Sequence, residues 1–172
     1  TTFVFFFSMQ GFRGSMVPLF GGTELGIGAG ALGVLLGASA AIRFVITLAS
    51  GFMSDRYGRK SILIPGILLL AAGSLGFTLA RDQTGFIVAL AILSLGGFGN
   101  SVPTTMVVDC VGSGRVGMAI SVNRFIGDAG VLVGPVILGV ILDTMGFQAV
   151  VIATVALLIS TLPGIVFAVR EK

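Results

Sequence analysis

The chain contains no histidine and no tryptophan, and it has one cysteine, Cys110, and one tyrosine. Without histidine, most zinc and haem sites and the catalytic triads lack their usual ligand or base. A single cysteine cannot form an intrachain disulfide or a cysteine-based metal cluster. No nucleophile–base pair stands out, so the sequence predicts neither an enzyme, nor a metal site, nor a bound cofactor.

Charged residues are also scarce. They make up 10% of the 172 residues, whereas soluble domains carry about 25%. Hydrophobic residues make up 55%, and the mean hydropathy is +1.12. The net charge of +3 does not predict a nucleic-acid partner, because the basic residues lie between apolar stretches rather than on one face. This composition predicts an integral membrane protein.

Six apolar stretches approach the length of roughly 20 residues that a helix needs to cross a bilayer. The connectors between them are short and leave no room for a soluble domain. We therefore expect an all-α membrane protein, residues 1–172 forming a single six-helix bundle with antiparallel neighbours. The predicted spans cover residues 3–20, 27–53, 61–80, 85–108, 116–142 and 147–169.

Basic residues outside these spans are distributed unevenly between the two sides. One side holds Arg56, Arg59, Lys60, Arg115, Arg170 and Lys172. The other side holds only Arg81. Lys and Arg in short loops mark the cytoplasmic side, so the turn at residues 55–60 is expected to face the cytoplasm. With six spans both chain ends are expected there too, in a multi-pass protein of the cell membrane.

Four ionisable residues fall well inside the predicted spans: Arg13, Arg43, Arg124 and Asp128. Such a residue costs at least about 2.5 kcal/mol on insertion scales and is a candidate functional residue. Arg124 and Asp128 share a helix face, which fits a structural salt bridge or a proton-coupling site at Asp128. One carboxylate cannot neutralise three guanidiniums. Another part of the protein, water or an anionic substrate must balance them, or Arg13 reaches the nearby membrane surface.

Helical spacing groups further polar residues with these. Ser39, Arg43, Thr47 and Ser50 form a polar stripe on the second predicted span. Gln10 shares a face with Arg13 on the first, and Asn100 lies on the fourth. The candidate coupling or substrate residues are Gln10, Arg13, Arg43, Asn100, Arg124 and Asp128.

The two halves of the chain resemble each other faintly. Arg43-Phe44-Val45 leads to Asp55-x-x-Gly58, and Arg124-Phe125-Ile126 leads to Asp143-x-x-Gly146. The offsets, 81 and 88 residues, are close to half of the chain. Secondary transporters are often built from three helices followed by three of inverted topology. The repeat favours a 3+3 inverted arrangement of the six spans.

Residues 51–60 read Gly-Phe-Met-Ser-Asp-Arg-Tyr-Gly-Arg-Lys. This run resembles the loop motif of the major facilitator superfamily, G-x-L-a-D-R-x-G-R-K-x-x-L, with Met53 in place of leucine. It lies between the second and third predicted spans, as in that family. The resemblance implies a conformational latch made of Gly51, Asp55, Arg56, Gly58, Arg59, Lys60 and Asp109.

In such a latch, Asp55 would face the positive amino-terminal end of a neighbouring helix. Arg59 would pair with Asp109 at the end of the fourth span, and Gly58 would allow the tight turn. These contacts would hold the cytoplasmic side closed in one conformation. The alternative is a basic loop that only sets the topology.

A second stretch, residues 130–139, resembles the g-x-x-x-G-P-x-x-G-G motif of the family's antiporters, with Leu138 in place of one glycine. Its members on the fifth span are Gly130, Gly134, Pro135 and Gly139. Small residues at this spacing let helices approach closely in lipid. Two interpretations of these residues stay open: they serve helix packing alone, or they take part in the moving parts of the protein.

The resemblance covers the whole chain as one six-helix half of a twelve-helix transporter. Arg124 and Asp128 followed by Gly134-Pro135, with no arginine early in the fourth span, favour the carboxy-terminal half. The resemblance implies transport of a small solute by alternating access, as proton-coupled efflux antiport. The expected partners are the lipid bilayer, the solute, protons or another coupling ion, and the other six-helix half.

Two alternatives stay open. The first is an uptake symporter of the same family. The second is a six-helix scaffold or sensor that does not transport. Polar residues that face a shared cavity favour transport, whereas the same residues all buried within the bundle favour the scaffold.

Overall fold

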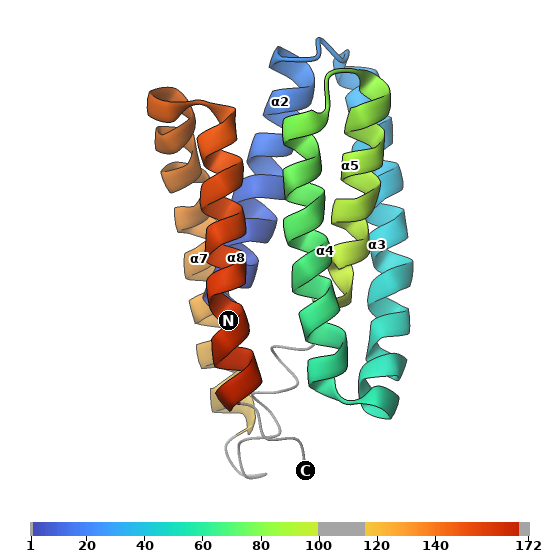
Figure 1. Ribbon diagram of the computed structural model, residues 1–172. Coiled ribbons are helices and arrows are strands. Elements are labelled where there is room, and N and C mark those ends of the chain that lie inside the picture. Colours follow the sequence, from blue (N-terminus) through green and yellow to red (C-terminus); the bar gives the residue numbers. More distant parts are fainter. Residues whose placement is uncertain (1, 100–115, 169–172) are drawn as a thin grey trace.

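The computed structural model describes residues 2–99 and 116–168, and these form helices joined by short turns (Figure 1). The first helical segment has three parts, α1 (Thr2–Phe6), η1 (Phe7–Met16) and α2 (Val17–Thr23), which we call the first span. It is followed by α3 (Ala29–Tyr57), α4 (Arg59–Leu79) and α5 (Gln83–Leu95), which continues into the short 3-10 helix η2 (Gly96–Gly99). The last two helices are α7 (Val116–Met145) and α8 (Phe147–Ala168).

Four of the described helices, α3, α4, α7 and α8, are long and apolar enough to cross a membrane. Helix α5 is a shorter apolar helix, and the predicted fourth span beyond Gly99 lies outside the described residues. The observed helix ends agree with the predicted boundaries to within a few residues. Helices satisfy their own backbone hydrogen bonds, which is why they can cross lipid. This architecture is typical of an integral, multi-pass membrane protein.

Two connectors are single glycines with positive φ angles. Gly58, at φ 87°, separates α3 from α4, and Gly146, at φ 81°, separates α7 from α8. Glycine reaches this conformation without a steric penalty. The predicted loop at residues 55–60 is therefore largely helical, because α3 and α4 both run up to Gly58. The same geometry at both glycines agrees with the repeat in the sequence.

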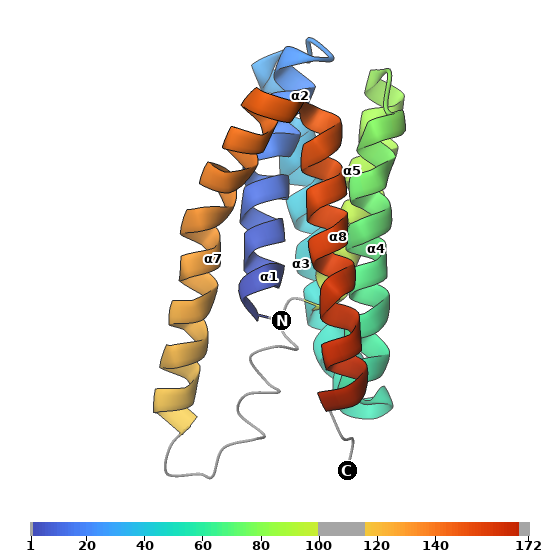
Figure 2. The same cartoon turned by 60° about the vertical axis from the view of Figure 1, so that its left-hand side comes forward.

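Successive turns lie at opposite ends of the bundle (Figures 1 and 2). The α3–α4 turn is at the lower end in Figure 1, and the α2–α3, α4–α5 and α7–α8 connections are at the upper end. Arg81, between α4 and α5, is thus at the opposite end from Arg56 and from the start of α4. For the basic residues on the described helices and turns, the two sides that the sequence predicts are the two ends of the bundle, whereas Arg115, Arg170 and Lys172 lie outside the described residues.

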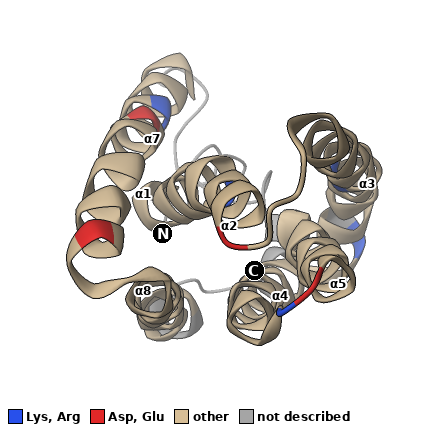
Figure 3. Ribbon diagram, turned by 90° about the horizontal axis from the view of Figure 1, so that it is seen from above, with Lys and Arg blue, Asp and Glu red and all other residues tan. Residues whose placement is uncertain are grey.

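Seen along the helix axes, the first span lies between α7 and α3 (Figure 3). It packs mainly against α7, whereas α4 packs against α5 and α8, and α3 contacts α5 and η2. Counted in chain order, the first span contacts the fifth, the second contacts the fourth, and the third contacts both the fourth and the sixth.

Helix α7 approaches the first span through glycines. A Cβ atom on Gly130 would lie 2.6 Å from the carbonyl oxygen of Phe3, and one on Gly134 would lie 2.8 Å from that of Phe7. A Cβ on Gly11 would lie 2.8 Å from the carbonyl carbon of Gly134. The two backbones are in direct contact, as small residues permit in lipid. We call Gly11, Gly130 and Gly134 the glycine seam.

Phenylalanine side chains fill the interior near the upper end. Phe20 of α2 and Phe147 of α8 stack with ring centroids 4.2 Å apart. Phe77 of α4 meets Phe86 of α5 edge-on at 5.5 Å and Phe12 of η1 at 5.8 Å. Aromatic pairs favour such offset and edge-on arrangements. This cluster joins the first span to α4, α5 and α8.

The glycine seam makes a testable prediction about stability. We expect Gly130→Ala to lower the free energy of unfolding by about 1–3 kcal/mol, because the added methyl group overpacks against the Phe3 carbonyl. Gly139→Ala on the same helix is the matched control, because a Cβ there has no neighbour within 4 Å. Loss of helical circular dichroism on heating in detergent measures both variants. Equal destabilisation by the two substitutions would contradict the seam.

Candidate functional site

Arg13 lies on η1 and reaches across to α3. Its Nη2 donates a hydrogen bond of 2.8 Å to the Oγ of Ser39, which is buried and donates in turn to the carbonyl oxygen of Leu36. The Nε of Arg13 is buried and has no hydrogen-bond partner. Arg13 is therefore held inside the bundle and does not extend to the membrane surface, which corrects one of the possibilities raised by the sequence.

Arg43 lies one turn after Ser39 on the same face of α3 and is half-buried. Its Nη1 is 3.8 Å from the Sδ of Met9. Its aliphatic stem packs on Gly97, where a Cβ would come within 2.7 Å of the Cγ of Arg43. Met9 and Arg13 are one turn apart on η1, and Ser39 and Arg43 are one turn apart on α3, so the two arginines are neighbours across the same helix contact. We call Arg13 and Arg43 the arginine pair.

The helix that carries Arg13 is irregular. η1 is a π-helix of 10 residues, and the N–H of Val17 at its end bonds to the carbonyl of Phe12, five residues back. π-helical turns are rare and occur often at functional sites. In the sequence, only Gly11 and Gly14 hint at an irregular helix here.

The polar stripe predicted on α3 faces the bundle. Ser39 and Ser50 are buried, and Arg43 and Thr47 are half-buried. Most other α3 side chains are exposed, and many of them are apolar. Gln10, by contrast, is exposed on η1. The structure thus brings Arg13 and Arg43 together, and the Gln10 side chain forms no hydrogen bond with either of them.

Arg124 and Asp128 are both exposed on α7, Arg124 one turn and Asp128 two turns after the exposed Ser121. Figure 3 shows acidic and basic positions close together on this helix. Neither side chain takes part in an ion pair with any described residue, so the predicted structural salt bridge is not formed in this structure. Asp128 is 12 residues from Val116 at the start of α7, or about 18 Å at 1.5 Å per residue. Asp128 therefore lies well inside the helix, at a distance from its start that is comparable to half of a hydrocarbon core about 30 Å thick.

The described residues of the predicted latch lie around the α3–α4 junction: Gly51, Asp55, Arg56, Gly58, Arg59 and Lys60. The guanidinium carbon of Arg56 is 5.6 Å from the ring centroid of Tyr57. Asp109 and Asn100 lie outside the described residues. The contact between Arg59 and Asp109 therefore stays a prediction.

The antiporter-like stretch divides into two parts. Gly130 and Gly134 belong to the glycine seam, and Pro135 lies half-buried inside α7. Gly139 has open space where a Cβ would be. Close helix contact therefore accounts for two of the three glycines in this motif.

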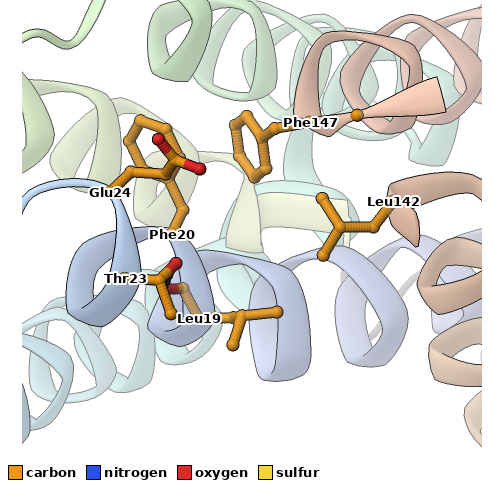
Figure 4. Close-up of a pocket in the computed structure, with 7 residues that line it drawn as sticks. Leu19, Phe20, Thr23, Glu24, Leu142 and Phe147 are labelled. Carbon is orange, nitrogen blue, oxygen red and sulfur yellow. Dashed lines mark hydrogen bonds between the residues drawn. The ribbon is translucent and has the colours of Figure 1, made fainter. Parts of the chain in front are cut away.

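A small pocket of about 230 Å³ opens at the upper end of the bundle (Figure 4). Leu19, Phe20, Thr23 and Glu24 line it from the first span and its end, and Leu142, Gly146 and Phe147 line it from the other side. A second pocket of about 300 Å³ shares Phe20, Glu24 and Phe147 with it. Sequence reasoning missed both pockets, because their walls come from segments far apart in the chain. The described residues contain no group of three or more His, Cys, Asp or Glu side chains that could hold a metal ion.

The bond between Arg13 and Ser39 can be tested by stability. We expect Ser39→Ala to lower the free energy of unfolding by about 1.5–3 kcal/mol, the usual range for a hydrogen bond to a charged group. Ser160→Ala is the matched control, because the exposed Ser160 bonds only to its own helix, at the carbonyl of Leu157. Thermal unfolding in detergent compares the two. If Ser39→Ala proved as mild as Ser160→Ala, the bond would not hold Arg13 in place.

Comparison with known proteins adds to this geometry. The family model of the Major Facilitator Superfamily matches residues 1–172. The multidrug resistance protein MdtG of Escherichia coli is 31% identical over 157 residues, which are 87% of this chain and 38% of that protein. The arabinose-proton symporter of Bacillus subtilis is 39% identical over 61 residues, 35% of this chain and 13% of that protein.

The chain thus spans less than half the length of these relatives. The family match extends over every residue of the chain, and the described helices are of membrane-spanning type. This multi-pass membrane protein belongs to the major facilitator superfamily, a family of transporters and not of enzymes.

Proposed function

We propose that residues 1–172 form one six-helix half of a transporter that moves a small solute across the cell membrane by alternating access. The observation that carries this proposal is the position of Arg124 and Asp128. Both are exposed on a helix of membrane-spanning length, 8 and 12 residues after its first residue, Val116. Charged residues within a membrane span face a water-filled cavity or another part of the protein rather than lipid.

The same observation favours transport over a six-helix scaffold. A scaffold would bury its polar residues within the bundle. Arg124, Asp128 and Gln10 are instead exposed on the surface of the described bundle. They are available to a cavity shared with the companion half.

The helix contacts support a 3+3 inverted repeat. Such a repeat exchanges the first helix with the fourth, the second with the fifth, and the third with the sixth. Under this exchange, the contact between the first and fifth helices corresponds to the contact between the fourth and second helices. The contact between the third and sixth helices corresponds to itself. All three contacts occur among the described helices. The positive-φ turns at Gly58 and Gly146 are related by the same exchange.

The distribution of basic residues supports an orientation of the chain in the membrane, and the motifs on α7 support its assignment to one half of the transporter. The turn at Gly58 carries the basic cluster, so we place it in the cytoplasm together with both chain ends. Arg124 and Asp128, followed by Gly134 and Pro135, favour the carboxy-terminal half.

For the mode of transport we propose proton-coupled efflux antiport, with Asp128 as the proton-binding residue. The antiporter-like stretch on α7 and the similarity to a multidrug resistance protein support efflux. The similarity to a sugar–proton symporter favours the second candidate, uptake by symport. Asp128 is suited to exchange protons in either case, because it is exposed and its carboxylate has no ion-pair partner among the described residues.

The role of Asp128 is tested by Asp128→Asn in the full-length transporter reconstituted into vesicles. We expect the rate of solute movement driven by a proton gradient to fall at least tenfold, because an amide side chain does not bind and release protons. Exchange of labelled for unlabelled solute should continue. Asp143→Asn is the matched control, since Asp143 is an exposed acid at the end of the same helix.

If proton-driven transport by Asp128→Asn were undiminished, Asp128 would not be the residue that couples proton and solute movement. A pH dye inside the vesicles separates the two modes of transport. Solute leaving the vesicle acidifies the lumen in antiport and makes it more alkaline in symport.

The latch is tested separately by Asp55→Ala. We expect turnover to fall about tenfold, because charge contacts at helix ends contribute up to about 2 kcal/mol and the closed state would lose one. Asp143→Ala is the control, since Asp143 precedes the equivalent turn at Gly146. Initial transport rates in vesicles, normalised to protein content, provide the measurement. Full activity in Asp55→Ala would leave the basic turn with a topological role alone.

A further inference from the structure

The arginine pair has many more hydrogen-bond donors than acceptors around it. Each guanidinium carries five N–H groups and stays protonated in a protein. Among the described residues, Arg13 has one bonded acceptor, the Oγ of Ser39, and its Nε is buried without a partner. In the described part of the chain, the only hydrogen-bond acceptor of Arg43 is the sulfur of Met9, at 3.8 Å, and a thioether is a weak acceptor. The pair therefore has several N–H donors left for an acceptor group with several oxygens.

The charge of the pair is also uncompensated within the described chain. The acids whose side chains the structure describes, Glu24, Asp82, Asp128 and Asp143, form no ion pair with either arginine. Two like charges in proximity repel each other, and the two arginines are neighbours across the contact between the first span and α3. Ionisable residues inside a membrane protein pair with an opposite charge or mark the path of a solute. An anion at this position would relieve both the repulsion and the burial of charge.

The backbone around the pair is shaped to hold it. Gly97 leaves the space that the stem of Arg43 occupies. Arg13 projects from the π-helical stretch of the first span. Irregular backbone at membrane depth is tolerated where it is enclosed by protein or lines a cavity. The hydrogen bond that Arg13 donates to Ser39 fixes one end of its guanidinium, so the arginine is ordered before any ligand binds.

We propose that Arg13 and Arg43 bind the anionic group of the transported solute, a carboxylate or a phosphate-type oxyanion. The inference rests on the proposed transport function and names the substrate class of that site. A guanidinium presents parallel N–H donors that match the paired oxygens of such groups. Because the two arginines come from the first span and α3, a bound oxyanion connects these two helices.

The test uses the full-length transporter in lipid-free detergent at constant ionic strength. Its unfolding temperature is measured with sodium benzoate, with inorganic phosphate and with benzamide, which is a neutral analogue of benzoate. We expect benzoate or phosphate to raise the unfolding temperature in a saturable way and benzamide to leave it unchanged. Arg13→Gln and Arg43→Gln should each weaken anion binding at least tenfold. Arg81→Gln is the control, because Arg81 is exposed in the turn between α4 and α5.

Arg13→Lys and Arg43→Lys keep the charge but lose the forked geometry, and we expect intermediate affinities. These two variants decide the question if the glutamine variants do not fold. The proposal is overturned if benzoate and benzamide act alike, or if the substituted proteins bind anions as the wild type does. It is also overturned if no anion binds, which would mean that an acidic side chain of the companion half occupies the pair.

Measuring transport in vesicles distinguishes a failure of the proposed anion site from a failure of the proposed transport function. A protein that binds benzoate through the pair but moves no solute contradicts the transport function. A protein that transports, but whose solute exchange is insensitive to benzoate and to substitution of the pair, contradicts the anion site.

Discussion

The fold depends on how closely two backbones can approach in lipid. Lipid tails are as apolar as leucine, so helices in a bilayer associate by close packing rather than by the hydrophobic effect. The glycine seam provides that packing between α7 and the first span. The first span then lies between α7 and α3 (Figure 3), and from there Arg13 reaches Ser39. A side chain at Gly130 or Gly134 would move the first span and so disturb the arginine pair from a distance.

Much of the architecture can be predicted from the sequence because the bilayer sets the length of each helix. Apolar stretches of about 20 residues have few other structural solutions, and the observed helices match the predicted spans to within a few residues. The turns were predicted less well. Residues 55–57 could belong to a helix or a loop by composition, and they are helical because one glycine at position 58 is enough to reverse the chain.

The candidate site has features that could not be predicted from the sequence. Helical spacing puts Arg124 and Asp128 on one face, but only tertiary packing decides which side of α7 is buried. The buried side is the one with Gly127, Gly130 and Gly134, so the charged residues are left outside. Spacing also could not pair Arg13 with Ser39, which are 26 residues apart on different helices. The π-helical stretch adds to this difficulty, since its wider turns rotate the residues away from positions counted at 3.6 per turn.

The charges inside the membrane constrain how a proton and a solute can be coupled. Protonation of Asp128 removes a negative charge, so the membrane-embedded region becomes more positive. An anion at the arginine pair is then attracted more strongly, and by reciprocity the bound anion favours the protonated carboxyl. Electrostatics alone thus makes an anionic solute and a proton bind together, as in symport. Antiport of an anion therefore requires the conformational change itself to make the two ligands alternate, with each conformation accessible to only one of them.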